Sequence, residues 1–203
     1  MLVLHHLENS RSQRILWLME ELGLDYEIVH YARDPVTSRA PAALRDVHPL
    51  GKSPVLADGD TLLCESGAIV EYLVSRHGDG RLVPASGSPE WARYIQWLHF
   101  AEGSAMFPLL LDLFLGMLPE GGAPLGDAVK QEARALLGYL ETELEGRDYF
   151  AGDEFSAADV LMSFVVDMAQ GRGFLEGHER LVAHQERMRA RPAYQRAQER
   201  GAS

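Results

Sequence analysis

The first 23 residues constrain the fold of this chain more than any other stretch of the sequence. Residues 2–4 are an apolar run of the kind that forms a buried strand. From residue 15 onward apolar side chains recur at helical spacing, and Gly23 stands where a helix commonly ends. The stretch therefore predicts a strand, a short polar loop and a helix.

The loop between that strand and that helix carries three side chains that can cap a helix: Asn9, Ser10 and Ser12. At such a junction several unpaired backbone N–H groups and the positive end of the helix dipole point at one small volume. A hydroxyl there has two interpretations. It caps the helix, or it donates a hydrogen bond to a bound anion.

Composition limits the classes of function. The 203 residues are 46% hydrophobic, enough for one or two cores, and the net charge of −11 argues against nucleic acid and anionic membranes as partners. Apolar stretches such as 106–118 are interrupted by Pro108 and Asp112, and we expect them to be too short to cross a membrane. No secretory signal is expected at the start, and the single cysteine favours a cytoplasmic setting.

The order of predicted elements divides the chain in two. After the first strand and helix, the pattern predicts a strand over 26–31, a short helix over 42–47, a hairpin with its turn at 58–60, and a helix over 68–77. We therefore expect one small α/β domain over residues 1–79. A Gly- and Pro-containing linker over 80–88 precedes an all-helical domain over 89–203, which begins with a long helix over about 89–115.

Four motifs in this order carry a family resemblance. They are Ser10-Arg11-Ser12-Gln13-Arg14 with 18–24, Gly51-Lys52-Ser53-Pro54-Val55-Leu56, Glu65-Ser66-Gly67-Ala68-Ile69, and Phe155-Ser156-Ala157-Ala158-Asp159. The sequence resembles the cytosolic glutathione S-transferases over nearly its whole length, of serine type and bacterial appearance. The resemblance implies a thioredoxin-like domain followed by an all-helical domain (α/β plus all-α), a homodimer, and glutathione as substrate.

Within that resemblance Ser10 matches the serine that activates glutathione, with Ser12 and Asn9 as alternatives. The thiolate is the nucleophile, and a free thiol has a pKa of about 8.5. Lowering that pKa by about two units takes about 2.7 kcal/mol. One hydrogen bond to the charged sulfur supplies about 1.5–3 kcal/mol, and a helix N-terminus about 0.3–1 kcal/mol. No general base is needed. From the residues alone, a simple capping role is the commoner one for a serine at this position, and the resemblance favours activation.

The resemblance also implies the residues that bind glutathione. Ser53 and Pro54 match the family's cis-proline step, where the backbone pairs with the cysteinyl unit. Lys52 would bind the glycyl carboxylate, or is a solvated turn lysine. Glu65 and Ser66 match the pair that recognises the γ-glutamyl unit; read from the residues alone they are a strand-end acid and a helix cap.

Other positions receive structural or secondary roles. Met106, Phe107 and Leu110 belong to an apolar stripe that is mostly core, of which one or two members are expected to line a pocket for the electrophile. Cys64 is expected to be a buried core cysteine. No spacing of His, Cys and acidic residues suggests a metal site. Asp159 is expected to cap a helix, at a loss of about 1 kcal/mol when removed.

The resulting hypothesis is a glutathione transferase that conjugates the thiolate to small apolar electrophiles. A close variant of this hypothesis is an enzyme that uses the same thiolate for isomerisation, dehalogenation or peroxide reduction. The alternative class is an interaction or regulatory module that kept the fold without the chemistry. A thioredoxin-type redox protein is disfavoured because no Cys-x-x-Cys follows the first strand.

Overall fold

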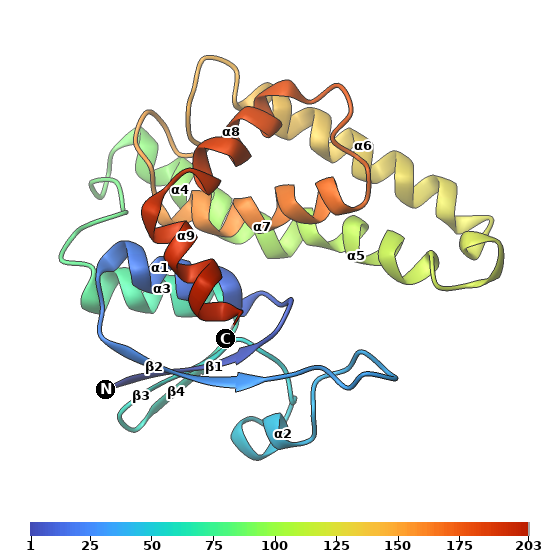
Figure 1. The fold of residues 1–203 in the computed structure, drawn as a ribbon. Helices are drawn as coiled ribbons and strands as arrows, with labels where there is room; N and C mark the ends of the chain where they lie inside the picture. The colour runs from blue at the N-terminus through green and yellow to red at the C-terminus, as the bar shows by residue number, and fades with distance from the viewer. Residues whose placement is uncertain (203) are drawn as a thin grey trace. The chain divides into compact units, whose positions relative to one another are not determined.

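The computed structural model describes residues 1–202 and divides them into two compact units, shown in Figure 1. Unit 1 comprises Met1–Leu82 with Arg189–Ser203, and unit 2 comprises Val83–Met188. The helices and strands of unit 1 are β1 (Leu2–Leu7), α1 (Ser12–Leu22), β2 (Tyr26–Tyr31), α2 (Ala43–Val47), β3 (Val55–Asp58), β4 (Thr61–Cys64), α3 (Ser66–His77) and α9 (Pro192–Gly201).

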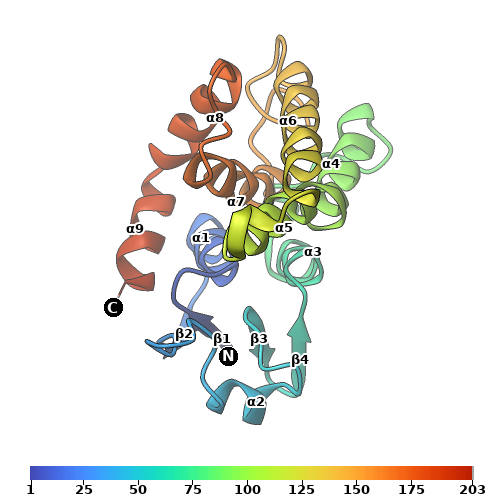
Figure 2. The same ribbon diagram turned by 90° about the vertical axis from the view of Figure 1, so that its right-hand side faces the viewer.

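Unit 1 is built on a four-stranded sheet in the order β2-β1-β3-β4. β1 pairs with β2 in parallel, as the strand–helix–strand pattern predicts, and the hairpin β3–β4 is antiparallel. α1 and α3 cover one face of this sheet and α2 lies on the other (Figure 2). α1 begins at Ser12, three residues before the predicted periodic run, and ends at Gly23 in the left-handed conformation.

The core of unit 1 lies between α1, α3 and the sheet. The buried side chains alternate along β1, and those of α1 form a continuous apolar face. The largest fully buried ones are Leu4, Ile15, Leu16, Trp17, Leu18, Met19, Leu22, Leu56 and Ile69. This core fixes the end of β1 against the start of α1, where the polar loop lies.

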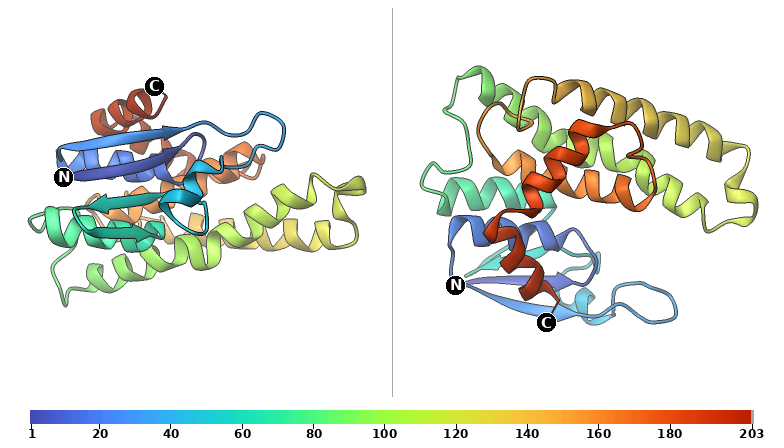
Figure 3. Two further views of the ribbon diagram at one scale, coloured as in Figure 1. Left: turned by 90° about the horizontal axis from the view of Figure 1, so that it is seen from below. Right: turned by 45° about the horizontal axis from the view of Figure 1, so that its top comes forward.

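The last helix, α9, belongs to unit 1, whereas the sequence pattern groups it with the helical residues 89–203. α9 lies beside α1 (Figure 3, right). Two glutamates of α1 hold it: Glu21 pairs with Arg191 at 2.6 Å, and Glu20 with two arginines further along α9, Arg196 at 2.7 Å and Arg200 at 2.9 Å. No periodicity within residues 192–201 specifies which helix they pack on.

Unit 2 is helical throughout, as predicted. Its elements are α4 (Pro89–Phe100), the π-helical turn η1 (Ala101–Ala105), α5 (Met106–Leu115), the 3-10 turn η2 (Pro119–Gly122), α6 (Leu125–Glu143), α7 (Ala157–Gly171) and α8 (Glu179–Arg189). Ser88 caps α4 by accepting a hydrogen bond from the Trp91 backbone at 3.1 Å. The predicted helix over 89–115 is interrupted by η1. α7 is the helix of unit 2 with the most buried residues, and it packs on α4 and α5.

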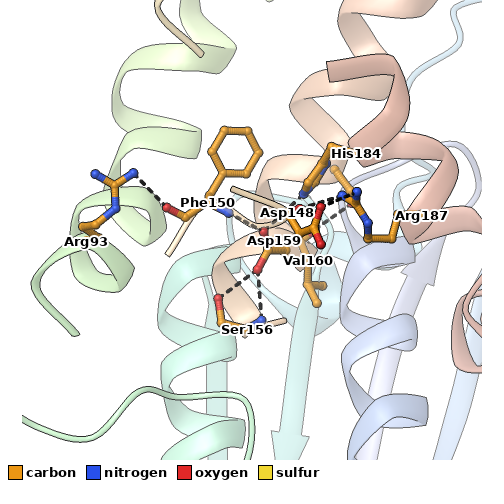
Figure 4. Close-up of polar contacts among 9 residues, drawn as sticks. Arg93, Asp148, Phe150, Ser156, Asp159, Val160, His184 and Arg187 are labelled. Atoms are coloured by element: carbon orange, nitrogen blue, oxygen red, sulfur yellow. Dashed lines mark hydrogen bonds and ion pairs between the residues drawn. The ribbon is translucent and has the colours of Figure 1, made fainter. Parts of the chain in front are cut away.

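Asp159 fixes the start of α7 (Figure 4). Its carboxylate accepts hydrogen bonds from the Ser156 backbone at 2.9 Å and hydroxyl at 3.0 Å, which confirms the predicted cap. It also accepts from the Phe150 backbone at 2.9 Å and contacts Nε2 of His184 at 3.2 Å. The cap therefore also ties down the loop before α7 and the helix α8.

The helical stretch Pro89–Leu115 is 27 residues long, and by length and composition only it is apolar enough to cross a membrane. Its length is that of the predicted helix over 89–115, whereas the expectation of stretches too short to span a membrane considered residues 106–118 by themselves. Within this stretch, 44% of the most apolar segment is buried inside the protein, and core helices of water-soluble proteins can be equally long and apolar. One such helix is weak support for a membrane span.

Candidate active site

The strand register brings most of the predicted glutathione residues to one end of the sheet. His5 of β1 is opposite Val55 of β3, and Val55 is opposite Cys64 of β4. The carboxyl end of β1, the turn before β3 and the residues after β4 therefore lie at the same edge. That edge carries Ser10 after β1, the segment Lys52, Ser53 and Pro54 before β3, and Glu65 and Ser66 after β4.

Ser10 lies in the loop between β1 and α1 and is 8% exposed. Its hydroxyl accepts a hydrogen bond from the Ser12 backbone at 3.2 Å, and its carbonyl accepts from the Gln13 backbone at 3.1 Å. The N-cap position itself is Arg11, which makes no side-chain cap. Ser10 therefore performs a capping function, and it keeps a small exposed fraction of 8%.

Ser12, the first alternative, is fully buried. Its hydroxyl lies 2.8 Å from the Ser10 hydroxyl, 2.8 Å from Nδ1 of His6, and 3.3 Å from both the N–H and the carbonyl of Leu7. A hydroxyl has one hydrogen to donate and two lone pairs. These neighbours saturate it, so Ser12 joins β1 to α1 and has no exposed surface.

Asn9, the second alternative, is exposed and adopts a left-handed backbone with φ of 48°. Arg33 fixes this part of the loop. Its guanidinium donates to the carbonyls of Glu8 at 3.0 Å and Asn9 at 2.9 Å, and its backbone N–H donates to the Glu8 carboxylate at 2.8 Å. The loop carbonyls are thereby held by Arg33, which leaves the helix N-terminus free of competing acceptors from residues 8 and 9.

Ser53 continues the sheet where the β1–β3 ladder ends. Its hydroxyl donates to the His5 carbonyl at 2.9 Å and accepts from the Leu7 backbone N–H at 3.2 Å. The Ser53–Pro54 peptide bond is cis, as the resemblance implies. The side chain of Ser53 therefore has a structural function, and its backbone remains the part expected to pair with a ligand.

Glu65 and Ser66 stand at the start of α3. Glu65 is exposed with φ of 73°, while Ser66 is 3% exposed and is the first residue of the helix. An exposed carboxylate and a helix N-terminus at one edge suit an ammonium and a carboxylate on the same ligand. Lys52 is exposed in the turn after Gly51.

Two histidines of β1 differ in their surroundings. Burial lowers the pKa of His5, whose Nδ1 lies 2.9 Å from the Tyr31 hydroxyl. Burial also lowers the pKa of His6, partly offset by the carbonyl of Gly201, which lies 3.1 Å from Nε2. Both rings are therefore neutral at pH 7.

The three apolar candidates in unit 2 differ in exposure. Met106 is 1% exposed and belongs to the helical core, Phe107 is 67% exposed, and Leu110 is half-buried. Cys64 is half-buried, not fully buried as predicted, because it lies at the end of β4, the edge strand. Within residues 1–202, no group of three or more His, Cys, Asp or Glu is placed to hold a metal ion.

Sequence reasoning missed three participants in this loop: His6, Arg33 and Gly201. Each acts through a backbone carbonyl or across a long sequence separation, which residue patterns do not reveal. The sequence feature that came closest to indicating these contacts is His6, a polar residue near the end of an apolar strand.

Family models match both parts of the chain: the glutathione S-transferase N-terminal domain over residues 1–75 and the C-terminal domain over 95–192. The glutathione S-transferase 3 of Schizosaccharomyces pombe is 39% identical over 185 residues, covering 84% of this chain and 75% of that protein.

Solved structures agree. A glutathione S-transferase from Actinobacillus pleuropneumoniae superimposes with a TM-score of 0.92 at 32% identity, covering 100% of this chain and 94% of that one. A sphingomonad glutathione S-transferase complexed with glutathione gives a TM-score of 0.80 at 26% identity, with 98% of both chains covered. The thioredoxin-like unit followed by helices is thus confirmed, and the chain belongs to the glutathione S-transferase family as a glutathione transferase enzyme.

Proposed function

We propose that this transferase is of serine type: the Ser10 hydroxyl donates a hydrogen bond to the glutathione sulfur and stabilises it as the thiolate. The observation that carries this proposal is the contrast within the loop. Ser12 is 0% exposed and its hydroxyl has four polar neighbours, Asn9 carries no hydroxyl, and Ser10 is 8% exposed with its hydroxyl 3.2 Å from the Ser12 backbone nitrogen at the start of α1.

The rest of glutathione is bound along the same sheet edge. The cysteinyl backbone pairs with the main chain at Ser53, beside the cis bond to Pro54. The α-carboxylate of the γ-glutamyl unit accepts hydrogen bonds from the start of α3 at Ser66, and Glu65 pairs with its ammonium. Lys52 attracts the glycyl carboxylate as an exposed point charge.

The reaction is the conjugation of the thiolate to a small apolar electrophile. Ionisation of the thiol releases its proton to solvent, and the sulfur then forms a bond to an electrophilic carbon. That carbon loses a leaving group as an anion or, in an activated double bond, passes its π electron pair to the neighbouring atoms, which take up a proton from solvent. Phe107 and Leu110 offer apolar surface for the electrophile, whereas Met106 is a core residue. The protein acts as a cytoplasmic homodimer in detoxification, a proposal that rests on the family alone.

Titration calorimetry at pH 7 tests the catalytic part. Glutathione binding is measured in buffers of different ionisation enthalpy, which gives the number of protons released. We expect release of a large fraction of a proton from the wild-type protein, and much less from Ser10→Ala. Ser75→Ala is the matched control, because Ser75 is an exposed serine in the same unit whose hydroxyl bonds only within α3.

The other outcomes separate the alternatives. Binding without proton release would point to a glutathione carrier or sensor. No binding by the wild-type protein would refute the enzyme reading and favour an interaction module on this fold. Equal proton release from wild type and Ser10→Ala would refute the role of Ser10 alone.

A further inference from the structure

His6 is a buried ring with a polar partner on each nitrogen. It is 1% exposed; Nε2 lies 3.1 Å from the carbonyl oxygen of Gly201, and Nδ1 lies 2.8 Å from the Ser12 hydroxyl. A carbonyl oxygen can only accept, so Nε2 carries a hydrogen. Burial lowers the pKa of His6, which keeps the ring neutral, and a neutral ring has one hydrogen. Nδ1 is therefore an acceptor.

The direction of the next two hydrogen bonds follows. Since Nδ1 accepts, the Ser12 hydroxyl donates its single hydrogen to His6. The contact of 2.8 Å between the Ser10 and Ser12 hydroxyls also needs a hydrogen, and the one on Ser12 is already used. Ser10 is therefore the donor. In the resting protein its hydrogen points inward to Ser12, away from the edge where the proposed function places the thiolate.

We propose that His6 is a positioning residue: held by the carbonyl of Gly201, it orients the Ser12 hydroxyl so that the Ser10 hydrogen stays turned inward until an ionised sulfur is bound. This inference rests on the proposed function of Ser10. The inference adds a chain of hydrogen bonds to the site, which runs from Ser10 through Ser12 and His6 to the last turn of α9.

The consequence is discrimination between thiol and thiolate. A neutral thiol is a weak acceptor and does not compete with the Ser12 oxygen for the Ser10 hydrogen. A thiolate does, because hydrogen bonds to charged acceptors are about twice as strong as neutral ones. Breaking the inward bond reduces the gain, so the ionisation constant of bound glutathione is lower than Ser10 alone would allow, by about two- to tenfold.

Gly201, whose carbonyl contacts His6, also lies against the side chain of Gln13 in α1. A Cβ built at this position would overlap with the carboxamide of Gln13. That carboxamide in turn donates to the carbonyl of Ala197 at 2.7 Å. The close approach of α9 to this end of α1 is therefore part of the arrangement that sets the tautomer of His6.

Two substitutions of His6 provide the test. Phenylalanine has a similar shape but no nitrogen, so Ser12 is released and donates to Ser10, its nearer acceptor at 2.8 Å compared with 3.3 Å for the Leu7 carbonyl. Ser10 then points its hydrogen outward. In His6→Gln the amide can donate to Gly201 and its oxygen can accept from Ser12, which preserves the wild-type directions.

The readout is the pKa of bound glutathione, followed by the ultraviolet absorbance of the thiolate. We expect His6→Phe to raise the ionisation constant about two- to tenfold, and His6→Gln to match wild type. A lower ionisation constant in His6→Phe, or no difference between His6→Phe and wild type, would overturn the proposal. If Ser10→Ala leaves the pKa unchanged, the proposed function fails instead, so the two failures are distinguishable.

Nitrogen NMR of the wild-type protein provides a measurement that does not depend on how well the variants fold. The imidazole nitrogens of His6 are expected to report the neutral form protonated at Nε2 at pH 7. A neutral ring protonated at Nδ1, or a doubly protonated ring, would reverse the direction of the Ser12 hydroxyl and overturn the inference.

Discussion

Replacing Asp159 by alanine is expected to destabilise the protein by about 3–5 kcal/mol. The carboxylate is fully buried and serves four donors: the Ser156 backbone and hydroxyl, the Phe150 backbone, and the His184 ring. Removing it leaves the N–H groups of Ser156 and Phe150 without their acceptor in a buried setting.

The magnitude follows from these contacts. Loss of the helix cap costs about 1 kcal/mol, which was the whole of the sequence estimate. The orphaned Phe150 N–H adds about 1–3 kcal/mol. His184 adds a further contribution of about 1 kcal/mol or more, because its Nδ1 is buried and has no hydrogen-bond partner within residues 1–202, so Asp159 satisfies the ring. The losses from neighbouring contacts are not fully additive, so the total loss in the free energy of unfolding is limited to about 5 kcal/mol.

Urea denaturation followed by far-ultraviolet circular dichroism measures this loss. In a thermal scan the expected fall is about 6–20 °C, at about 2–4 °C per kcal/mol for a chain of this size. Asp153→Ala is the matched control, because Asp153 is an exposed aspartate in the loop before α7. A loss below about 1 kcal/mol for Asp159→Ala would refute the reasoning from buried contacts.

Three further predictions concern other parts of the chain. Arg33→Met should weaken glutathione binding about threefold to tenfold in calorimetry, since the loop carbonyls lose their donor; unchanged affinity would contradict this. Burial lowers the pKa of His6 below 6.5, so its contribution to stability is complete above pH 6.5 and is lost as the pH falls toward the folded-state pKa. Denaturant midpoints of wild type should therefore drop more than those of His6→Gln between pH 7 and 5. Arg172→Met leaves the buried Asp112 carboxylate unpaired and should cost about 2–4 kcal/mol, whereas Arg180→Met, at a more exposed pair, should cost less than about 1 kcal/mol.

Local patterns predicted the elements well. The apolar run of residues 2–4, the turn at 58–60 and the cap at Ser156 each depend on neighbouring residues, and all three are found where expected. The π-helical turn at Ala101–Ala105 within the helix over 89–115 was not predicted, although the adjacent Gly103 and Ser104 are a pair at which helices often lose regular geometry.

The site was predictable to the level of which residues gather, and not to the level of what each one contacts. The motifs named Ser10 and Ser53, but the hydroxyl of Ser53 turned out to bridge β1, and Ser12 to bind His6. Such contacts depend on side-chain directions and on the packing of α9 against α1. The side-chain directions and this packing are set by tertiary contacts between residues nearly 200 positions apart in the sequence, such as His6 and Gly201.

The packing of α9 on α1 also has a consequence for synthesis. Because Met1–Leu82 and Arg189–Ser203 form one unit, Val83–Met188 is an insertion between two parts of it. During synthesis residues 1–82 lack the segment that pairs with Glu20 and Glu21 until residues 189–201 have also emerged from the ribosome. Unit 1 therefore begins to emerge before unit 2 and is completed after it, with a long segment between its two parts. A chain truncated before residue 201 would contain every motif of the glutathione site and still lack the carbonyl that orients His6.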